Sequence, residues 1–506
     1  MPRSDIAALS DHPQAPTCGF EYVADLGRLP EQSAEVVVCA VAHASDGRRL
    51  ELPPVRLTAT APSRAVDEPR AAELRARSAR LVARARDASR RRTPERPRRI
   101  RLLAFSHQLP YGGASLYLFE LLRRFARHEQ FECTVVTFED GPLRPELERL
   151  GIPVHVTDSF PVSSLERYEG SLAELSAWAA TGDFDVALIN SLACFSGAEV
   201  ARRLGVPAVW AIHESFDLPR FWMTAFKPGT LHPYVRVRAE RYLREVAALI
   251  FEAEATRRLY LPYADAHRLI AEPYGIELAE IAAVRDPASR GAARNRLGIP
   301  EPARLILCLG TIEPRKSQAM LVDAFARVAD RHPHALLGLV GEVDAPWVSA
   351  YVDGVRERVR RSGHADRARI VPVTPDAYDW HLASDLHVCA SDVESLPRSV
   401  LEAMAFQRPV VSTRVFGVAD LIDDGRTGYL CDTRDAAALA GRLDDALRAE
   451  PGELRSVVAA AAAHVFRHHD PDAYADRLWR LVSRLAADPG ADPRAALADA
   501  DQRIAI

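Results

Sequence analysis

Residues 390–411 read ASDVESLPRSVLEAMAFQRPVV and place Glu394 and Glu402 eight positions apart. Apolar residues before this stretch predict a strand, and a polar turn then leads into a helix that contains Glu402. Pro397 is expected in the first turn of that helix, where its missing N–H costs nothing. In open α/β sheets, ligands bind at the carboxyl ends of the strands. Two carboxylates there suit a polyhydroxylated ligand, and the alternative is a helix N-terminal acid beside an unrelated surface glutamate.

Buried-strand patterns alternate with amphipathic helix patterns along most of the chain. The first series begins at Ile100, and a second runs from about residue 304 to residue 465. Strands that alternate with helices predict a parallel, doubly wound sheet in each half. We therefore expect an α/β protein with two Rossmann-like, doubly wound domains. The expected strands lie at residues 100–107, 131–138, 186–192, 208–215, 304–309, 335–342, 369–375, 385–391 and 409–415.

Composition excludes several classes of function. With 506 residues and 48% hydrophobic content, the chain can bury two substantial cores. Its net charge of −4 argues against a nucleic acid or another polyanion as a general partner. The seven cysteines form no Cys-x-x-Cys pair, and no histidine cluster has ligand spacing, so neither a zinc site nor a disulfide framework is expected. Because no leader-like or membrane-spanning apolar run is found, we expect a cytoplasmic protein.

The amino-terminal part of the chain differs from the rest. Alternating apolar residues in AEVVVCAVAHA and RLELPPVRLTA, joined through Ser-Asp-Gly at residues 45–47, predict a β-hairpin. An Arg-rich segment follows at residues 70–101, and its Ala and Leu content predicts a helix up to about Ala88. We favour a solvated linker helix, because its apolar face is thin. The alternative is a basic segment that holds the protein near anionic lipid at the inner membrane face.

The sequence around the two glutamates resembles a family signature. Residues 391–405, SDVESLPRSVLEAMA, and residues 409–430, PVVSTRVFGVADLIDDGRTGYL, closely resemble the donor site of retaining GT-B glycosyltransferases of family 4. The resemblance extends over about residues 100–485. It implies transfer of a sugar from a nucleoside-diphosphate sugar to a hydroxyl of a saccharide or lipid-linked acceptor. It further implies a role in surface polysaccharide or glycoconjugate biosynthesis, with no cofactor.

The resemblance also assigns roles to the parts of the chain. It implies the GT-B architecture, in which the two domains face each other across a cleft, and closure at the turn of residues 273–275 would exclude water from that cleft. The expected parts are a β-rich appendage at 1–65, an Arg-rich helical linker at 66–99, an acceptor domain at 100–272, a nucleotide-sugar donor domain at 273–465, a helix at 466–485 that packs back on the acceptor domain, and a disordered tail at 486–506.

Two cations are expected at the carboxyl end of one strand. The buried strand that ends at Gly310 is followed by Pro-Arg-Lys at the start of a helix, and a departing diphosphate needs positive charge. Enzymes of family 4 have a lysine six residues beyond this glycine, in contact with the diphosphate, and Lys316 occupies that offset. The only other lysine is Lys227, against 63 arginines. Thr311 stands where the commonest family pattern has arginine, so Arg315 is expected to supply the second cation; a solvated Arg-Lys pair is the alternative.

The resemblance gives the residues of the Glu-x7-Glu stretch separate roles. Glu394 is expected to bind hydroxyls of the donor sugar on the face opposite the leaving group, and Glu402 to bind the ribose hydroxyls. Backbone N–H groups of Ser395 and Leu396 are expected to reach the sugar and phosphate, because Pro397 has no N–H to donate.

Candidate residues in the amino-terminal half lie at the ends of two expected strands. Gly112 and Gly113 open a helix after the first strand, where glycines let the backbone approach a phosphate, and their place matches the ligand loop of the family. His213 matches the histidine that lies over the anomeric carbon in related enzymes; the alternative is a turn histidine with local hydrogen bonds. Glu214 is a candidate contact for the acceptor.

No metal site is expected. The Asp-x-Asp at residues 183–185 comes before its strand and is interpreted as a polar turn, and the one at residues 499–501 lies in the expected tail. Lys316 and Arg315 would therefore neutralise the diphosphate. Two rival hypotheses are a catalytically silent scaffold that binds a sugar nucleotide, and a GT-B epimerase, for which the sequence offers no clear acid/base pair.

Overall fold

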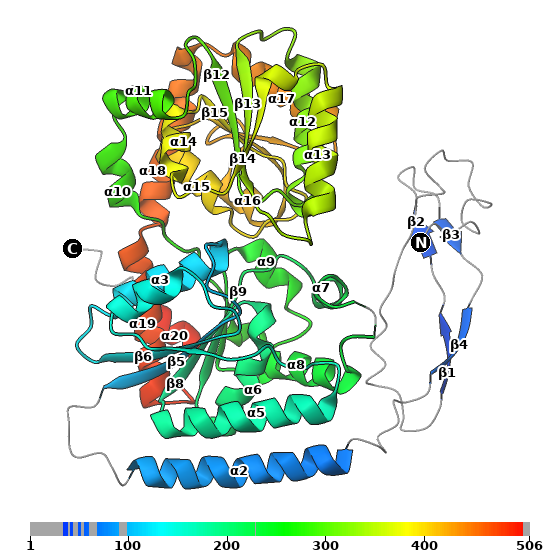
Figure 1. Cartoon of the computed structure of the whole chain (residues 1–506), viewed down its shortest axis with the longest axis vertical. Coiled ribbons are helices and arrows are strands. Elements are labelled where there is room, and N and C mark those ends of the chain that lie inside the picture. The colour runs from blue at the N-terminus through cyan, green and yellow to red at the C-terminus, as the bar shows by residue number, and fades with distance from the viewer. Residues whose placement is uncertain are drawn as a thin grey trace.

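The computed structural model describes two α/β domains, an amino-terminal hairpin, and a long helix that precedes the first domain (Figure 1). The two large sheets contain seven and six strands, all paired in parallel. The expected α/β class with two doubly wound domains is confirmed. The described residues are 34–38, 41–43, 49–51, 55–59, 68–90, 99–227 and 229–498.

The first domain is built on a sheet in the order β11-β10-β9-β8-β5-β6-β7. The chain order reverses between β5 and β8, which is where sheets of this kind bind ligands. Its strands are β5 (Ile100–Ser106), β6 (Phe131–Thr137), β7 (Val154–Val156), β8 (Val186–Asn190), β9 (Ala208–Ile212), β10 (Ala248–Phe251) and β11 (Leu269–Ala271). Its helices are α3 (Gly113–Phe125), α4 (Leu143–Arg149), α5 (Leu165–Ala179), α6 (Phe195–Leu204), α7 (Leu218–Ala225), α8 (Pro233–Glu245) and α9 (Glu254–Leu259).

The second domain has a sheet in the order β14-β13-β12-β15-β16-β17, with the reversal between β12 and β15. Its strands are β12 (Arg304–Leu309), β13 (Ala335–Glu342), β14 (Ala368–Pro372), β15 (Leu386–Cys389), β16 (Val410–Thr413) and β17 (Tyr429–Cys431). Its helices are α10 (Leu278–Val284), α11 (Pro287–Arg296), α12 (Gln318–Val328), α13 (Ser349–Arg361), α14 (Ala377–Ala383), α15 (Arg398–Ala405), α16 (Phe416–Leu421), α17 (Ala436–Arg448) and α18 (Pro451–His468).

Alternate residues of the central strands fill opposite faces of each sheet. In β5, Leu102 and Ala104 belong to one apolar core, and Leu103 and Phe105 belong to another. This alternation is what a strand with two covered faces requires. The core that contains Leu102 continues through α15 and β12 of the second domain, so the two domains share one apolar cluster.

The chain crosses between the domains twice, and the two crossings touch. His469 Nδ1 lies 2.8 Å from the carbonyl oxygen of Tyr274, and the N–H of Ile276 donates to the carbonyl of His469 at 3.1 Å. A Cβ at Gly275 would lie 2.4 Å from the Pro471 backbone, so glycine is required there. After the second crossing, α19 (Pro471–Ala487) lies against α3 of the first domain.

The carboxyl-terminal segment differs from the expected disordered tail at 486–506. It contains α20 (Pro493–Ala498), which packs on α19 and buries Leu497. Arg494 Nη2 also donates to the carbonyl of Ala266 at 2.8 Å. A six-residue helix is unstable alone, so only these tertiary contacts, invisible in the local pattern, explain it. Residues 499–501, which hold the second Asp-x-Asp, lie outside the described residues.

The amino-terminal elements follow the predicted order. Strand β1 (Ala34–Val38) pairs antiparallel with β4 (Val55–Ala59), and β2 (Val41–His43) with β3 (Arg49–Glu51), which confirms the hairpin; its turn lies outside the described residues. The other predicted domain boundaries stay predictions.

The Arg-rich helix α2 (Glu68–Arg90) is not the solvated linker that was expected. One side lies along α5, where Ala71 and Val82 are buried. Arg75 also pairs with the fully buried Glu169 of α5 at 2.9 Å. A thin apolar stripe is therefore enough to hold α2 against α5, because ion pairs stabilise the rest of the interface between these two helices. Among the described residues, no helix has the length and apolar character needed to span a membrane.

Candidate active site

Four predicted residues lie together at the point where strand order reverses in the second sheet. Gly310 follows β12, and Glu394 lies in the loop after the neighbouring β15. Lys316 Nζ donates to Glu394 Oε1, and Arg315 Nη1 donates to Glu394 Oε2 at 3.2 Å. The structure thus brings both expected cations onto the expected sugar-binding carboxylate. These residues can present charge and hydrogen bonds to one polar ligand.

The environment of Glu394 keeps it charged. The residue is buried, and Ser391 Oγ donates to Glu394 Oε1 at 2.9 Å. Burial alone would raise the pKa of Glu394, but Lys316 and Arg315 outweigh it and hold the pKa below its ordinary value. The group is therefore a carboxylate at neutral pH, and it accepts hydrogen bonds without donating any.

Two glycines let the cation-bearing loop lie against the next strand. Gly310 has φ +142° and Gly341, near the end of β13, has φ +128°. A Cβ at Gly341 would lie 2.4 Å from the carbonyl oxygen of Gly310, so only glycine fits. A Cβ at Gly310 would lie 3.6 Å from Lys316 Nζ. Gly341 was not predicted as part of the site, because its contact is made across two strands.

Glu402 lies in a second polar cluster one turn into α15. Its side chain is buried; Arg398 Nε donates to Oε1 at 2.8 Å, and His381 Nε2 lies 3.2 Å from Oε2. Burial would raise the pKa of Glu402, but His381 and Arg398 lower it below its ordinary value. Pro397 caps α15 one position before the first turn in which it was expected.

His213 lies at the end of β9, between two oxygen acceptors. Its Nδ1 is 2.5 Å from Glu252 Oε1, and its Nε2 is 2.6 Å from Asn190 Oδ1. The Asn190 amide is oriented by its own Nδ2, which donates to the carbonyl of Ala114 at 2.8 Å. Both ring nitrogens must therefore donate, which requires the imidazolium form. Burial would lower the pKa of His213, but Glu252 raises it above its ordinary value.

The raised pKa of His213 predicts a pH-dependent stability. The pair with Glu252 stabilises the fold fully below about pH 6.5, and this contribution is lost as the pH rises through the raised pKa. We expect the free energy of unfolding to fall more between about pH 6 and about pH 9 in the wild type than in His213→Gln. Urea denaturation at both pH values measures this. The exposed His267→Gln is the control, and equal slopes in wild type and His213→Gln would contradict the assignment.

Both carboxylate oxygens of Glu214 accept hydrogen bonds from the protein, and its expected contact with the acceptor stays a prediction. Its Oε1 accepts from Ser191 Oγ at 2.5 Å, and its Oε2 accepts from the N–H groups of Leu192 and His213 at 3.1 Å. The carboxylate therefore joins the loop after β8 to the loop after β9. The spacing placed Glu214 at a strand end but did not show that a neighbouring loop uses both of its oxygens.

The glycine pair and the residues after Glu394 are placed by the structure, while their ligand contacts stay predictions. Gly112 caps α3 in an extended conformation, and a Cβ at Gly113 would meet no atom within 4 Å. Ser395 Oγ lies 3.2 Å from Thr256 Oγ1 of α9. The carbonyl of Leu396 accepts a hydrogen bond of 2.9 Å from the hydroxyl of Tyr274, where the chain first crosses between the domains. The Glu394 loop is thus anchored to the first domain.

Comparison with known proteins identifies the chain. Residues 111–280 match the model of Glycosyltransferase Family 4, and residues 289–465 match that of Glycosyl transferases group 1. The D-inositol 3-phosphate glycosyltransferase of Streptomyces scabiei is 30% identical over 403 residues, which cover 74% of this chain and 88% of the relative. That of Streptomyces avermitilis is 31% identical over 410 residues, which cover 74% and 85%. The chain belongs to glycosyltransferase family 4.

Solved structures confirm the GT-B fold of this glycosyltransferase. HepE of Anabaena, crystallised with UDP and glucose, superposes with a TM-score of 0.65 at 20% identity, over 76% of this chain and 99% of HepE. WaaG, a glycosyltransferase of lipopolysaccharide biosynthesis, gives a TM-score of 0.60 at 17% identity, over 76% and 99%. Family membership makes the chain a transferase of sugars.

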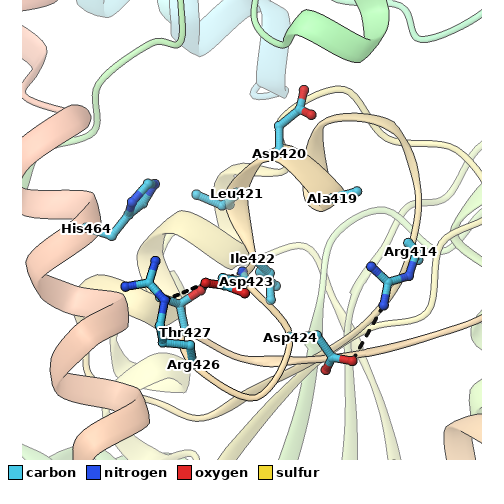
Figure 2. Close-up of a pocket in the computed structure, with 10 residues that line it drawn as sticks. All are labelled: Arg414, Ala419, Asp420, Leu421, Ile422, Asp423, Asp424, Arg426, Thr427 and His464. Atoms are coloured by element: carbon cyan, nitrogen blue, oxygen red, sulfur yellow. Dashed lines mark hydrogen bonds and ion pairs between the residues drawn. The ribbon is translucent and has the colours of Figure 1, made fainter.

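One cavity of the glycosyltransferase lies apart from the predicted residues, and another lies beside them. One of about 380 Å³ is formed by α16, the loop after it and His464 of α18, and contains none of the predicted residues (Figure 2). Another, of about 300 Å³, lies between the domains and is lined by Glu252 and Ala253 on one side and Leu396 and Gly417 on the other. It therefore adjoins the partner of His213 and the loop of Glu394.

The described part of the glycosyltransferase contains no group of three or more side chains that could hold a metal ion. The Asp-x-Asp at residues 183–185 is the polar turn that was predicted. Asp185 Oδ2 accepts from the N–H of Arg101 at 3.0 Å, and Asp183 pairs with the Arg101 guanidinium at 3.3 Å, both before β8.

Proposed function

We propose that this glycosyltransferase moves a sugar from a nucleoside-diphosphate sugar to an acceptor hydroxyl, with retention of configuration and without a metal ion. The observation that carries the proposal is the contact of Lys316 and Arg315 with Glu394 at the reversal point of the second sheet. Two fixed positive charges at that position stabilise the charge that builds on a departing diphosphate. They supply what a bound metal supplies in other transferases.

Glu394 and Lys316 exchange partners when the donor binds. The diphosphate competes for the lysine, and the released carboxylate oxygen accepts a sugar hydroxyl. Arg315 keeps a second contact, because Arg315 Nη2 pairs with Glu313 at 2.8 Å. Glu402 anchors the ribose, and His213 lies at the edge of the first domain that faces the sugar. With no side chain placed as a general base, the departing phosphate oxygen is the proposed proton acceptor.

The donor base and the acceptor follow from different observations. HepE binds UDP and UDP-glucose, so uridine is the first base to test. The curated relatives are named for an acceptor that carries a phosphate. Here, the loops at 107–112, 138–142, 191–194 and 213–217, after β5, β6, β8 and β9, contain no lysine or arginine. We therefore favour a neutral saccharide acceptor, as in polysaccharide or glycoconjugate synthesis.

A thermal-shift screen tests the proposal. UDP, GDP, ADP and dTDP sugars are added with EDTA, and one series is expected to add roughly 2.7 kcal/mol of stability at about 100 times its Kd. Glu402→Ala removes hydrogen bonds to a charged group and is expected to lose about tenfold or more in affinity. The exposed Glu129→Ala is the control and keeps the shift.

The outcomes of this screen separate the parts of the proposal. No shift with any sugar nucleotide would contradict the donor site, and a shift seen only without EDTA would contradict metal independence. Turnover of the bound donor with a neutral saccharide, read by NMR of the anomeric proton, distinguishes transfer with retention from silent binding. Faster turnover with D-inositol 3-phosphate would contradict the acceptor class.

A further inference from the structure

We propose that Arg398 is a positioning residue that ties the carboxylate of Glu402 to α3 of the other domain, and so holds the domains in the orientation needed for transfer. The inference rests on the proposed function, because it takes Glu402 as the contact for the donor ribose. Arg398 does not touch the reacting atoms in this scheme. It acts through Glu402 on one side and through Glu120 on the other.

The guanidinium of Arg398 joins two carboxylates from different domains. Its Nε donates to Glu402 Oε1 at 2.8 Å. Its Nη1 and Nη2 contact the two oxygens of Glu120, each at 2.8 Å, which makes a bidentate pair across the domain boundary. Arg398, Glu120 and Glu402 are exposed by 21%, 14% and 6%. Such a shielded, bidentate pair is screened little by salt and fixes geometry as well as charge.

This contact sets the orientation of the Glu402 carboxylate. A carboxylate has about four lone-pair sites, two on each oxygen. Arg398 occupies one site on Oε1, and His381 faces Oε2. One site on each oxygen is left, which matches the two neighbouring hydroxyls of a ribose. Loss of Arg398 would free the carboxylate to rotate and would leave a buried charge with one partner fewer.

The other half of the contact positions the opposite domain. Glu120 lies on α3, and Tyr117, one turn earlier on the same helix, packs its ring edge-on against His213 with centroids 4.6 Å apart. The position of α3 therefore couples Arg398 to the side chain that faces the sugar. Helix α3 therefore contacts both sides of the site: the side of Glu402 through Glu120 and Arg398, and the side of His213 through Tyr117.

Two substitutions separate the halves of this contact. Glu120→Gln removes the cross-domain half only, and we expect a Kd for UDP within twofold of the wild type but a kcat at least tenfold lower. Arg398→Gln removes both halves, and we expect at least a tenfold rise in the Kd for UDP together with the lower kcat. The double variant is expected to be no slower than Arg398→Gln. Arg127→Gln, two residues beyond the end of α3 and paired with Asp472 at an exposed site, is the control and keeps wild-type kinetics.

A wild-type kcat in Glu120→Gln would overturn the proposal, as would a loss of kcat that disappears when rates are normalised to folded protein. Glu402→Gln is the reference for the donor site. If it binds UDP like the wild type, the donor assignment fails and this inference fails with it. If it loses UDP while Arg398→Gln keeps wild-type kinetics, only the positioning role fails.

Small-angle X-ray scattering of the ligand-free protein gives a readout that does not depend on the donor base. Loss of the contact at Glu120 releases α3 from α15, so both Glu120→Gln and Arg398→Gln are expected to increase the radius of gyration. Arg127→Gln is expected to scatter like the wild type. Unchanged scattering from both test variants would overturn the proposal.

Discussion

Replacing Lys316 with alanine is expected to lower kcat by about 10²-fold or more, as when one preorganised donor is removed from a site of developing charge. Lys316 Nζ is one of two cations on Glu394 at the carboxyl end of β12. The other, Arg315, is already held by Glu313 and by the carbonyl of Val393 at 3.3 Å, so it has little freedom to replace the missing ammonium. Steady-state kinetics with a sugar nucleotide measure the loss.

The second lysine of the chain provides a matched control. Lys227 is exposed in the loop between α7 and α8, and Lys227→Ala is expected to keep wild-type kcat. Lys316→Arg separates charge from shape, since the guanidinium cannot present a compact charge at the same point. Equal melting temperatures would show that Lys316→Ala is folded. Near-native turnover in that variant would mean that the leaving-group assignment is wrong.

Gly417→Ala is expected to destabilise the protein by about 3 kcal/mol, near the top of the usual range for overpacking. A Cβ there would lie 1.9 Å from the carbonyl oxygen of Ser395 and 2.5 Å from the Cβ of Ala253, which belongs to the other domain. The nearest of these atoms is backbone, so the loop that follows Glu394 has to move. We expect activity to fall as well, because this loop positions the Glu394 carboxylate.

Urea denaturation measures this change in the free energy of unfolding. Gly354→Ala is the control, because Gly354 is exposed within α13 and a Cβ there would meet no atom within 4 Å. That substitution is expected to stabilise the protein by roughly 0.5–1 kcal/mol through helix propensity. If Gly417→Ala matches the wild type in stability and turnover, the close packing at the domain boundary does not constrain the loop.

The sequence predicted the parts of the site that are set by local chain geometry. Lys316 lies six positions beyond Gly310, and Glu402 eight positions beyond Glu394, within single strand–loop–helix units. Such units place the end of a strand and the start of the next helix at one edge of the sheet, and this arrangement does not depend on the packing of the rest of the chain. The α/β class was therefore predictable, as was the position of Lys316 and of Glu394, each at the carboxyl end of its own strand. Their meeting was not, because it depends on β12 and β15 being neighbours in the sheet.

Contacts between distant units were not predictable from one sequence. Arg398 lies four positions before Glu402, a helical spacing that could have indicated the pair. Its second partner, Glu120, is 278 residues away and depends on how the domains meet. The same holds for Glu252 beside His213, and for α20, which no local pattern indicates. Tertiary packing decides these contacts, and the secondary-structure propensities of the residues carry no information about tertiary packing.

Because α19 packs on α3, the first domain cannot complete its core in the order in which the chain is synthesised. Phe125 of α3 meets Trp479 of α19 with ring centroids 5.3 Å apart, and Leu118 and Leu121 share a core with Leu478. The ribosome makes α19 roughly 350 residues after α3, a delay of roughly 20–70 s at usual rates of translation. Throughout that time the first domain lacks part of its core. The first α/β domain is made before the second, but its core is completed only when α19 emerges.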